Sequence, residues 1–229
     1  MHTASLRYEG SSKFGYDNKW GYFPAVSIGW RIADEKFMKD VTWVDELKLR
    51  ADYGETGNQD FGNYLSLDTY SGFGYYPLND TYYQVWGPSR NTNYNLKWEK
   101  ALNTNIGVDF AIFQRISGSF NYYTRKNEDL LGYYPVQLPP NVVDETYANV
   151  GTMENSGIEL QLNASIVNAS DFNYDISFAG STIENEFVSF SNSQYKGQNF
   201  IDAVELPAPG SPGSTQRLEE GRRIGTNSR

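Results

Sequence analysis

Apolar and polar residues alternate over residues 95–126, which predicts two long strands joined by a tight turn at 113–115. In the first strand the even positions from 102 to 112 carry Leu, Thr, Ile, Val, Phe and Ile, whereas the odd positions carry Asn, Asn, Gly, Asp and Ala. Side chains of a strand alternate between the two faces of a sheet, so a period of two indicates strand. Each arm has roughly 9 to 11 alternating residues, the length at which a tilted strand crosses a bilayer.

The same alternation recurs along the rest of the chain. Further strands are predicted at 3–9, 22–32, 47–53, 158–166 and 172–181, with a tight turn at 168–171. Asp34 is a suitable cap for one helical turn at 35–39. The sequence EEGRRIG near the end opens one more strand. The prediction is therefore an all-β, antiparallel, up-and-down sheet of about seven to eight strands.

The connections between these strands sort by length. Antiparallel strands place successive connections at alternate ends of a sheet, so the long connections all leave from one end and the tight turns from the other. That sorting is typical of outer-membrane barrels and is not expected of a soluble β-sandwich. The medium connection at 33–46 shares the end of the tight turns. The predicted long loops are at about 10–21, 55–94, 131–151 and 189–220.

Charge and aromatic positions agree with a membrane strand. A Lys or Arg on a lipid-facing position near the midplane costs about 2 to 4 kcal/mol, and the apolar phase of the strands contains no charge. The charged strand residues fall in the opposite phase: Arg7, Arg31, Lys48, Arg50, Asp52, Asp109, Glu159 and Asp175. Aromatic residues near strand ends fit interfacial girdles, although aromatics also favour strands in general: Tyr8, Trp30, Tyr53, Trp98, Tyr122, Tyr123, Phe172 and Tyr174.

Composition removes several classes of function. The chain has no Cys and a single His, His2, so disulfides, Cys/His zinc sites and His-based triads are excluded. A net charge of -9 argues against nucleic-acid binding. No apolar run reaches the ~18 residues of a membrane helix, and no signal peptide is visible. No carboxylate pair stands out as acid and base, and the Gly-Phe-Gly at 72–74 lacks a third glycine. We expect no enzyme activity, metal or cofactor.

Several stretches resemble SusC/RagA-family TonB-linked (TonB-dependent) outer-membrane transporters. The combination LRADYGETGNQ, NLKWEK and NVGTMENSGIEL is the most specific part of the likeness. The resemblance covers about residues 3–225 and points to the C-terminal half of the barrel. The stretches that carry it are LRYEGSSKFG, GYFPAVSIGWRIADEKFM, LKLRADYGETGNQ, NLKWEKALNTNIGVDFAIF, ISGSFNYYTRKNEDLL, NVGTMENSGIELQLNASIVN and EEGRRIG.

The resemblance implies that residues 1–229 form a partial transmembrane β-barrel domain, which is one part of a 22-stranded barrel. It implies import of oligosaccharides or peptides across the outer membrane of a Gram-negative cell, with a SusD-like surface lipoprotein as partner. TonB-ExbB-ExbD would act through an N-terminal part, and the signal, plug and remaining strands are absent from this sequence. The alternative is a secreted or surface β-sandwich that binds carbohydrate as an adhesion module.

Loop aromatics are the candidate ligand-binding residues. Flat rings stack on sugar faces or on peptide side chains, and loops often carry function. The same rings could instead pack the loops onto one another or onto a partner lipoprotein. The candidates are Tyr75, Tyr76, Tyr82, Tyr83, Trp86, Tyr133 and Tyr134.

We predict that residues 1–229 do not transport solute by themselves. A sheet that spans a membrane must close, because an open strand edge leaves unpaired backbone groups in lipid. Reconstitution of these residues in lipid vesicles should give no selective solute flux. Selective flux would contradict the prediction.

Overall fold

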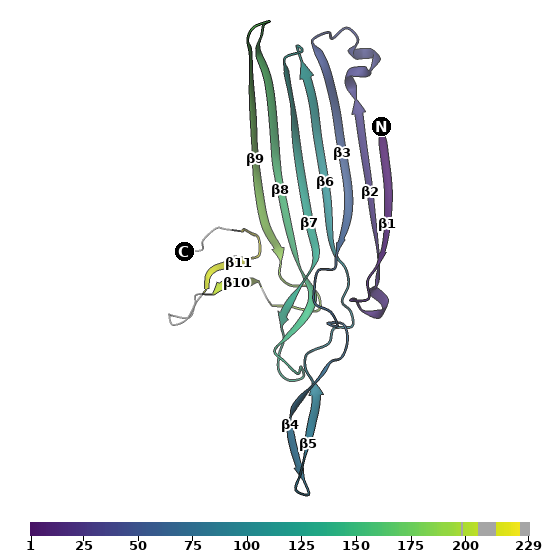
Figure 1. Ribbon diagram of the computed structural model, residues 1–229, viewed down its shortest axis with the longest axis vertical. Coiled ribbons are helices and arrows are strands. Elements are labelled where there is room, and N and C mark those ends of the chain that lie inside the picture. The colour runs from purple at the N-terminus through teal and green to yellow at the C-terminus, as the bar shows by residue number, and fades with distance from the viewer. Residues whose placement is uncertain (198, 206–213, 225–229) are drawn as a thin grey trace.

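The computed structural model describes residues 1–197, 199–205 and 214–224. Its main element is one antiparallel sheet with the strand order β1-β2-β3-β6-β7-β8-β9-β12 (Figure 1). Each of the first six strands in this order therefore pairs with the next long strand along the chain. The strands are β1 (His2–Gly10), β2 (Trp20–Arg31), β3 (Val44–Asn58), β6 (Glu99–Ile112), β7 (Ile116–Pro135), β8 (Glu145–Asn168), β9 (Asn173–Ser189) and β12 (Arg222–Arg223).

The remaining elements lie in the connections. Two hairpins form small sheets of their own, β4 (Tyr70–Leu78) with β5 (Thr81–Pro88), and β10 (Phe200–Glu205) with β11 (Ser214–Glu219). Short 3-10 turns are η1 (Tyr16–Asn18), η2 (Ile32–Asp34) and η3 (Lys36–Met38). Figure 1 shows the β6–β7 and β8–β9 turns and η2–η3 at one end of the sheet, and the long connections at the other. The predicted strands and the sorting of the loops are confirmed.

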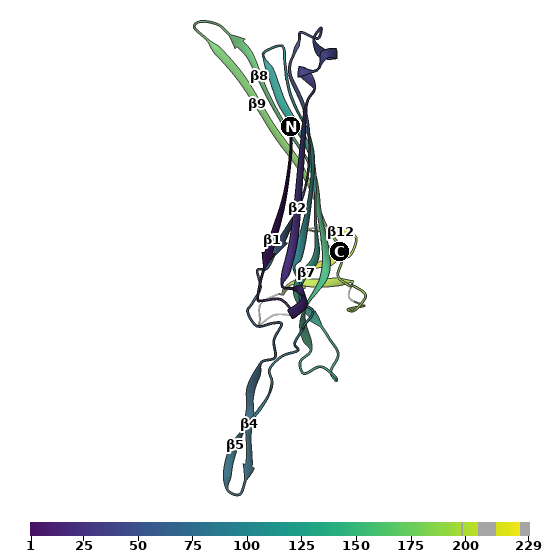
Figure 2. The same cartoon turned by 90° about the vertical axis from the view of Figure 1, so that its right-hand side faces the viewer.

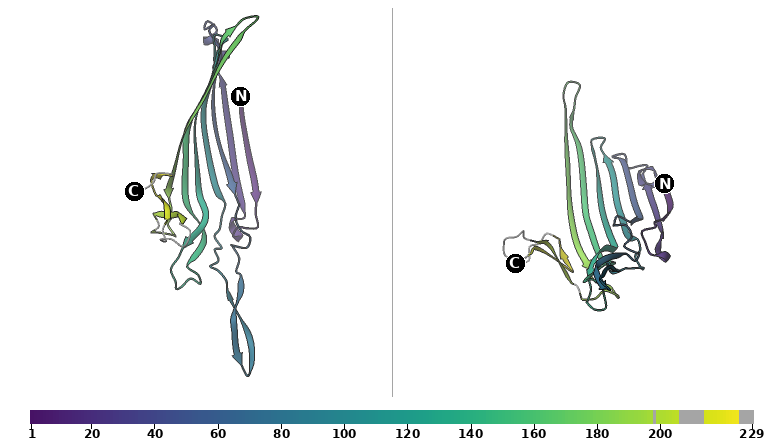
Figure 3. Two further views of the ribbon diagram at one scale, coloured as in Figure 1. Left: turned by 60° about the vertical axis from the view of Figure 1, so that its left-hand side comes forward. Right: turned by 60° about the horizontal axis from the view of Figure 1, so that its bottom comes forward.

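The sheet is a single curved layer. Seen edge-on in Figure 2, its long strands carry no second layer over most of their length, and the views of Figure 3 agree. Within the part of the chain that the structure describes, no other sheet packs face to face on it. The β-sandwich arrangement is therefore not observed.

Several strands extend further than the alternation predicted. β3 continues to Asn58, and the loop predicted at 131–151 shrinks to 136–144 because β7 and β8 are 20 and 24 residues long. The register between β7 and β8 shifts at Asn127 and Leu130. Such a bulge moves the apolar residues to the other phase, so the alternation was lost there although the strand continued.

The loop predicted at 55–94 contains the β4–β5 hairpin. Its turn residues Asn79 and Asp80 both have positive φ, 49° and 59°, as a two-residue type I′ turn requires. A register shift between Gly72 and Gly74 interrupts the alternation. Because aromatic residues occupy both faces of the hairpin, no period of two was visible in the sequence.

Two local predictions were wrong. Asp34 does not cap a turn at 35–39: it ends η2, and η3 follows Glu35 without a side-chain cap. The Asp34 carboxylate instead lies 3.4 Å from the Arg31 guanidinium. Trp98 is not an interfacial residue, because its side chain is buried in the core at the end of the sheet that bears the long connections.

The core is small and lies at that end. Phe14, Leu96 and Trp98 are almost fully buried, and the rings of Phe14 and Trp98 are 4.8 Å apart. Residues from several connections meet here with Phe23 of β2, and Leu131 and Tyr147 pack against them. The cluster consists of Phe14, Phe23, Phe61, Leu65, Leu96 and Trp98. The long connections are therefore packed together and are not independent flaps.

Asparagine side chains tie these connections to the start of β8. The Asn149 amide donates to the carbonyls of Lys97 and Asp129 (2.8 and 3.0 Å) and accepts from the Lys97 amide (3.0 Å). Asn192 donates to the Asn149 carbonyl at 2.9 Å. The Asn91 amide donates to two backbone carbonyls and accepts from the Val142 amide (2.8 Å). These side chains satisfy backbone groups where β8 extends beyond β9.

We predict that Asn149→Ala loosens the segment before β6. Removing the amide leaves partly buried backbone groups of Lys97 without their Asn149 partner, which costs about 1 to 3 kcal/mol. Hydrogen exchange of the Lys97 amide should accelerate by one to two orders of magnitude, about the factor that this free energy corresponds to. Asn163→Ala, toward the opposite end of β8, is the control and should leave this exchange unchanged. Equal exchange in both variants would contradict the role of Asn149.

Candidate functional site

The sheet has one apolar and one polar face, each defined by strand register. The apolar face contains the row through Ile106, namely Ile28, Ala51, Ile106, Tyr122, Ile158 and Thr182. One residue away along each strand, the polar face contains the row through Gly107, namely Gly29, Arg50, Gly107, Asn121, Glu159 and Ser181. The alternation seen in the sequence therefore holds across six strands.

The apolar face is bare. Ile106 is 55% exposed and Phe120 41%, and Leu160 is only partly buried. Monomeric soluble proteins rarely expose apolar patches of more than about 300 to 600 Å², and this face runs the length of the sheet. A face of this kind requires an apolar environment.

The apolar stripe runs diagonally across the strands. On β2 it extends from Trp20 to Trp30, and on β9 from Tyr174 to Gly180. Strand register places Ala25, the middle of the β2 stripe, level with Asn185, so the stripe has moved by about eight residues over five strand spacings. With about 3.3 Å per residue and about 4.8 Å between strands, it crosses the strands at about 45°. Strands of membrane barrels tilt by a similar angle, about 35–45°.

Charged residues border the stripe at the end that bears the long connections. Lys100 lies 3.5 Å from Glu55, and Lys126 lies 2.7 Å from Glu128. Arg223 pairs with Glu184 on β9. Aromatic pairs stand at both ends: Tyr8 stacks on Trp20 and Tyr22, and Trp43 stacks on Phe113 beside the tight turn. The apolar stripe is thus limited on both sides by groups that suit an interface.

The polar face carries small and hydrogen-bonded side chains. Arg50 donates through Nε and Nη2 to both carboxylate oxygens of Asp109 (2.7 and 2.8 Å) and through Nη2 to Asn121 (2.9 Å). Gly107 lies between them, and a Cβ there would collide with Asn121 and Arg50.

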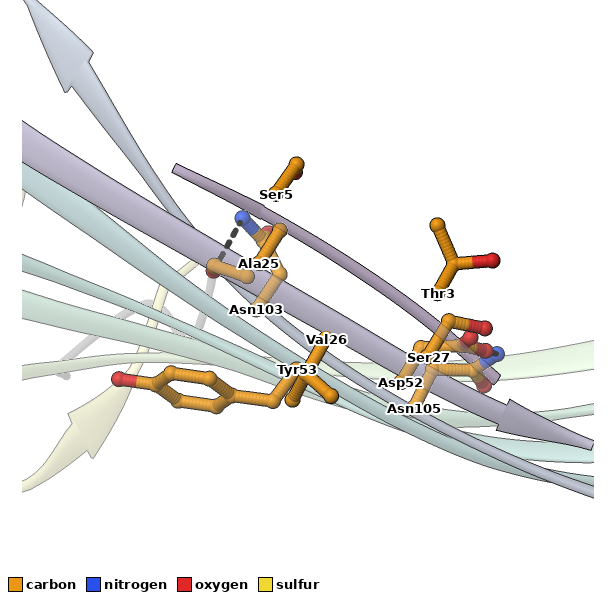
Figure 4. A pocket seen from close by; sticks show the side chains of 10 residues that line it. Thr3, Ser5, Ala25, Val26, Ser27, Asp52, Tyr53, Asn103 and Asn105 are labelled. Carbon is orange, nitrogen blue, oxygen red and sulfur yellow. Dashed lines mark hydrogen bonds between the residues drawn. The ribbon is translucent and has the colours of Figure 1, made fainter. Parts of the chain in front are cut away.

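A hollow of about 320 Å³ on β1, β2, β3 and β6 is shown in Figure 4, where Thr3 and Ser5 lie on one side of the strands and Tyr53 on the other. The residues that line it include Ser27, Asp52, Asn103 and Asn105. The face suits contact with water or with polar protein surface.

Five of the seven candidate aromatics lie on the β4–β5 hairpin. Tyr76 and Tyr83 are cross-strand partners and share one face. Tyr75, Tyr82 and Trp86 occupy the other face by strand alternation. All five are 54–73% exposed. The hairpin projects beyond the sheet at the end of the long connections (Figures 1 and 2).

The other two candidates differ from each other. Tyr133 is 63% exposed, and its ring makes an edge-to-face contact with the ring of Tyr147, with 5.0 Å between the ring centroids. Tyr134 is buried, and its ring packs at 5.0 Å on Tyr195. The structure therefore places Tyr133 and Tyr134 on opposite faces of β7, apart from the hairpin group.

A groove beside Asn91 was not foreseen from the sequence. It has a volume of about 430 Å³ and is lined in part by Arg90, Tyr133, Asp144 and Glu145. Arg90 and Glu145 are 55 positions apart in the sequence. The Asn91 hydrogen bonds, together with a bond from Asn93 to the Tyr147 carbonyl, bring their segments together. The one available signal was the cluster of asparagines in NTNYN, at 91–95.

Titratable groups of the loops are shifted by hydrogen bonding and burial. Tyr94 Oη donates to Asp68 at 2.7 Å, which lowers the pKa of Asp68 and raises that of Tyr94. Burial raises the pKa of Tyr147. Among the residues that the structure describes, no group of three or more His, Cys, Asp or Glu could hold a metal ion, and no helix is long and apolar enough to span a membrane.

Comparison with known proteins identifies the family. Residues 3–217 match the family model described as TonB dependent receptor-like, beta-barrel. The chain is 38% identical over 183 residues to the TonB-dependent receptor SusC of Bacteroides thetaiotaomicron, covering 78% of this chain and 18% of that protein. It is 36% identical to the TonB-dependent receptor P3 of Formosa agariphila, covering 99% of this chain and 22% of that protein.

Solved structures agree with these relatives. The RagAB peptide importer in its open-open state superposes with a TM-score of 0.78 at 28% identity, over 96% of this chain and 22% of that chain. The chain thus spans about a fifth of the length of the relatives that it matches. With a family match over nearly its whole length and a sheet of the same fold, the chain belongs to the TonB-dependent receptor β-barrel family, which includes SusC.

Proposed function

We propose that this chain forms part of the wall of a TonB-dependent transporter in the outer membrane. The apolar face contacts lipid hydrocarbon, and the polar face is turned to the barrel interior. The observation that carries the proposal is the uncovered apolar stripe that crosses the strands at about 45°, in a chain of this family. Further strands of the longer protein pair with the edges of β1 and β9 and close the barrel.

The cargo that we propose is an oligosaccharide or a peptide. SusC, a receptor of this family, is the relative at 38% identity, and the structural neighbour RagAB is a peptide importer. A SusD-like surface lipoprotein is the proposed partner, and TonB with ExbB and ExbD supplies energy through parts of the protein outside this chain. We propose no catalytic role. A secreted sandwich would need a second layer over the apolar face, and the described residues supply none.

Ile106→Arg should destabilise the full-length transporter in lipid. Ile106 lies near the middle of the stripe on β6, where an arginine facing hydrocarbon costs about 2 to 4 kcal/mol. Asn105→Arg is the matched control, because it places the same side chain one position away on the polar face, where Asn105 lies 3.3 Å from Asp52. Urea unfolding in lipid vesicles measures both. Equal destabilisation, or a greater loss in Asn105→Arg, would mean that the faces are assigned wrongly.

The hairpin aromatics are the proposed contact with cargo or with the lipoprotein. An isolated two-stranded hairpin is only marginally stable in water. This one exposes large rings on both faces and carries a single charge, Asp80, between Tyr70 and Pro88. A bound partner or cargo would cover those rings and stabilise the hairpin.

Replacing Tyr82, Tyr83 and Trp86 together by Ala in the full-length transporter should weaken cargo or lipoprotein binding at least tenfold. Truncating an aromatic residue that dominates an interface costs more than about 1 kcal/mol of binding free energy. A loss of about 1.4 kcal/mol weakens the affinity about tenfold. Tyr16→Ala, an exposed tyrosine of η1, is the control. Unchanged uptake and unchanged lipoprotein binding in the triple variant would remove this proposal.

A further inference from the structure

The groove beside Asn91 is a preformed surface built from three segments. It lies where the chain leaving β5 meets the β7–β8 hairpin, and Leu65 and Tyr147 form part of its wall. The Asn91 amide fixes its geometry through donated bonds to the carbonyls of Val143 and Glu145, at 2.7 and 2.8 Å. Preformed grooves bind ligands at a lower entropic cost than loops that must first become ordered.

Arg90 lines this groove, and its terminal amino groups are available to a ligand. Its Nε donates to Thr69 Oγ1 at 2.7 Å, and Thr69 Oγ1 lies 2.7 Å from Ser89 Oγ. Among the described residues, Arg90 makes no ion pair with a carboxylate, in contrast to Arg50 and Arg217. The two terminal amino groups of a guanidinium form a fork that matches a carboxylate. An arginine anchored through Nε presents that fork without a large loss of side-chain entropy.

Tyr133 supplies a flat apolar surface in the same groove. Its ring is fixed by the edge contact with Tyr147 and remains 63% exposed. Such a ring can cover a sugar face or a side chain that adjoins the ligand carboxylate. The carboxylates of Asp144 and Glu145 also line the groove, and their charge disfavours ligands that carry many negative groups.

We propose that this groove binds a carboxylate of the cargo, with Arg90 pairing to the carboxylate and Tyr133 covering the part of the ligand next to it. A peptide C-terminus and a uronic acid residue of an oligosaccharide share this chemistry. The inference rests on the proposed transport function and narrows its substrate to cargo with few acidic groups. It assigns a binding role to Arg90, which no sequence motif singled out.

The test measures binding to the full-length transporter, with its lipoprotein, for two matched pairs of ligands. One pair is an oligopeptide with a free C-terminus and the same peptide amidated. The other is a short oligouronate and the neutral oligosaccharide of the same linkage. In at least one pair the carboxylate form should bind at least tenfold more tightly, a factor in the range of a charged hydrogen-bonded pair. The pair that shows the preference identifies the source of the carboxylate.

Variants connect the preference to the groove. Arg90→Gln should abolish it, and Arg90→Lys should restore part of it, because lysine keeps the charge and loses the fork. Asp144→Asn should strengthen binding of the carboxylate form. Arg115→Gln, which removes an exposed arginine in the turn at the other end of the sheet, should have no effect. The amidated or neutral ligand should bind all variants equally, which shows that they are folded.

Two results would overturn the inference, and they are distinguishable. If both members of each pair bind equally, or if Arg90→Gln retains the preference, the groove does not recognise a carboxylate. Measured uptake of the cargo would then still support the transport function. If neither peptides nor oligosaccharides are bound or taken up, the proposed function fails and this inference fails with it.

Discussion

The structure depends on an unbroken ladder of antiparallel pairing that keeps two opposite surfaces in register. From β1 to β9 each strand pairs with its neighbour residue for residue, apart from shifts near a few strand ends and a bulge at Asn127–Leu131 inside β7. Because side chains alternate with a period of two, a slip of β6 by one residue would place Ile106 on the polar face, between Arg50 of β3 and Asn121 of β7. Pairing therefore decides both the fold and what each face can contact.

The end with the long connections is organised by a different interaction. There β8 continues beyond its pairing with β9, and asparagine amides satisfy backbone groups that a neighbouring strand would otherwise satisfy. A small aromatic core then packs these connections together. Similar bonds from Asn91 hold the groove around Arg90, so the order of the loops and the proposed carboxylate site have a common physical basis.

Much of the sheet could be predicted from sequence, and the rest could not for identifiable reasons. The strands with alternating small polar and large apolar residues, such as β6, were found because only one face is apolar. β4 and β5 were missed because tyrosines occupy both faces, and the continuation of β7 was missed because a bulge near Leu130 changes the phase. Trp98 shows that an aromatic residue near a strand end can belong to the core. Its burial depends on contact with Phe14, which is distant from it in the sequence. The Arg90 groove depends in the same way on side-chain amides that bridge about 50 residues.

The most direct test of the account is the depth of individual residues in the bilayer, measured with spin labels on the full-length transporter. Accessibility to oxygen relative to a water-soluble nickel chelate reports depth. If the apolar stripe follows the hydrocarbon layer diagonally, labels at Val26 and Phe178 lie at similar depth near the midplane, although pairing places Val26 level with Glu184. A label at Glu184 then lies nearer the surface. Equal depth for Val26 and Glu184, or free access of the chelate to Val26 and Phe178, would contradict the account.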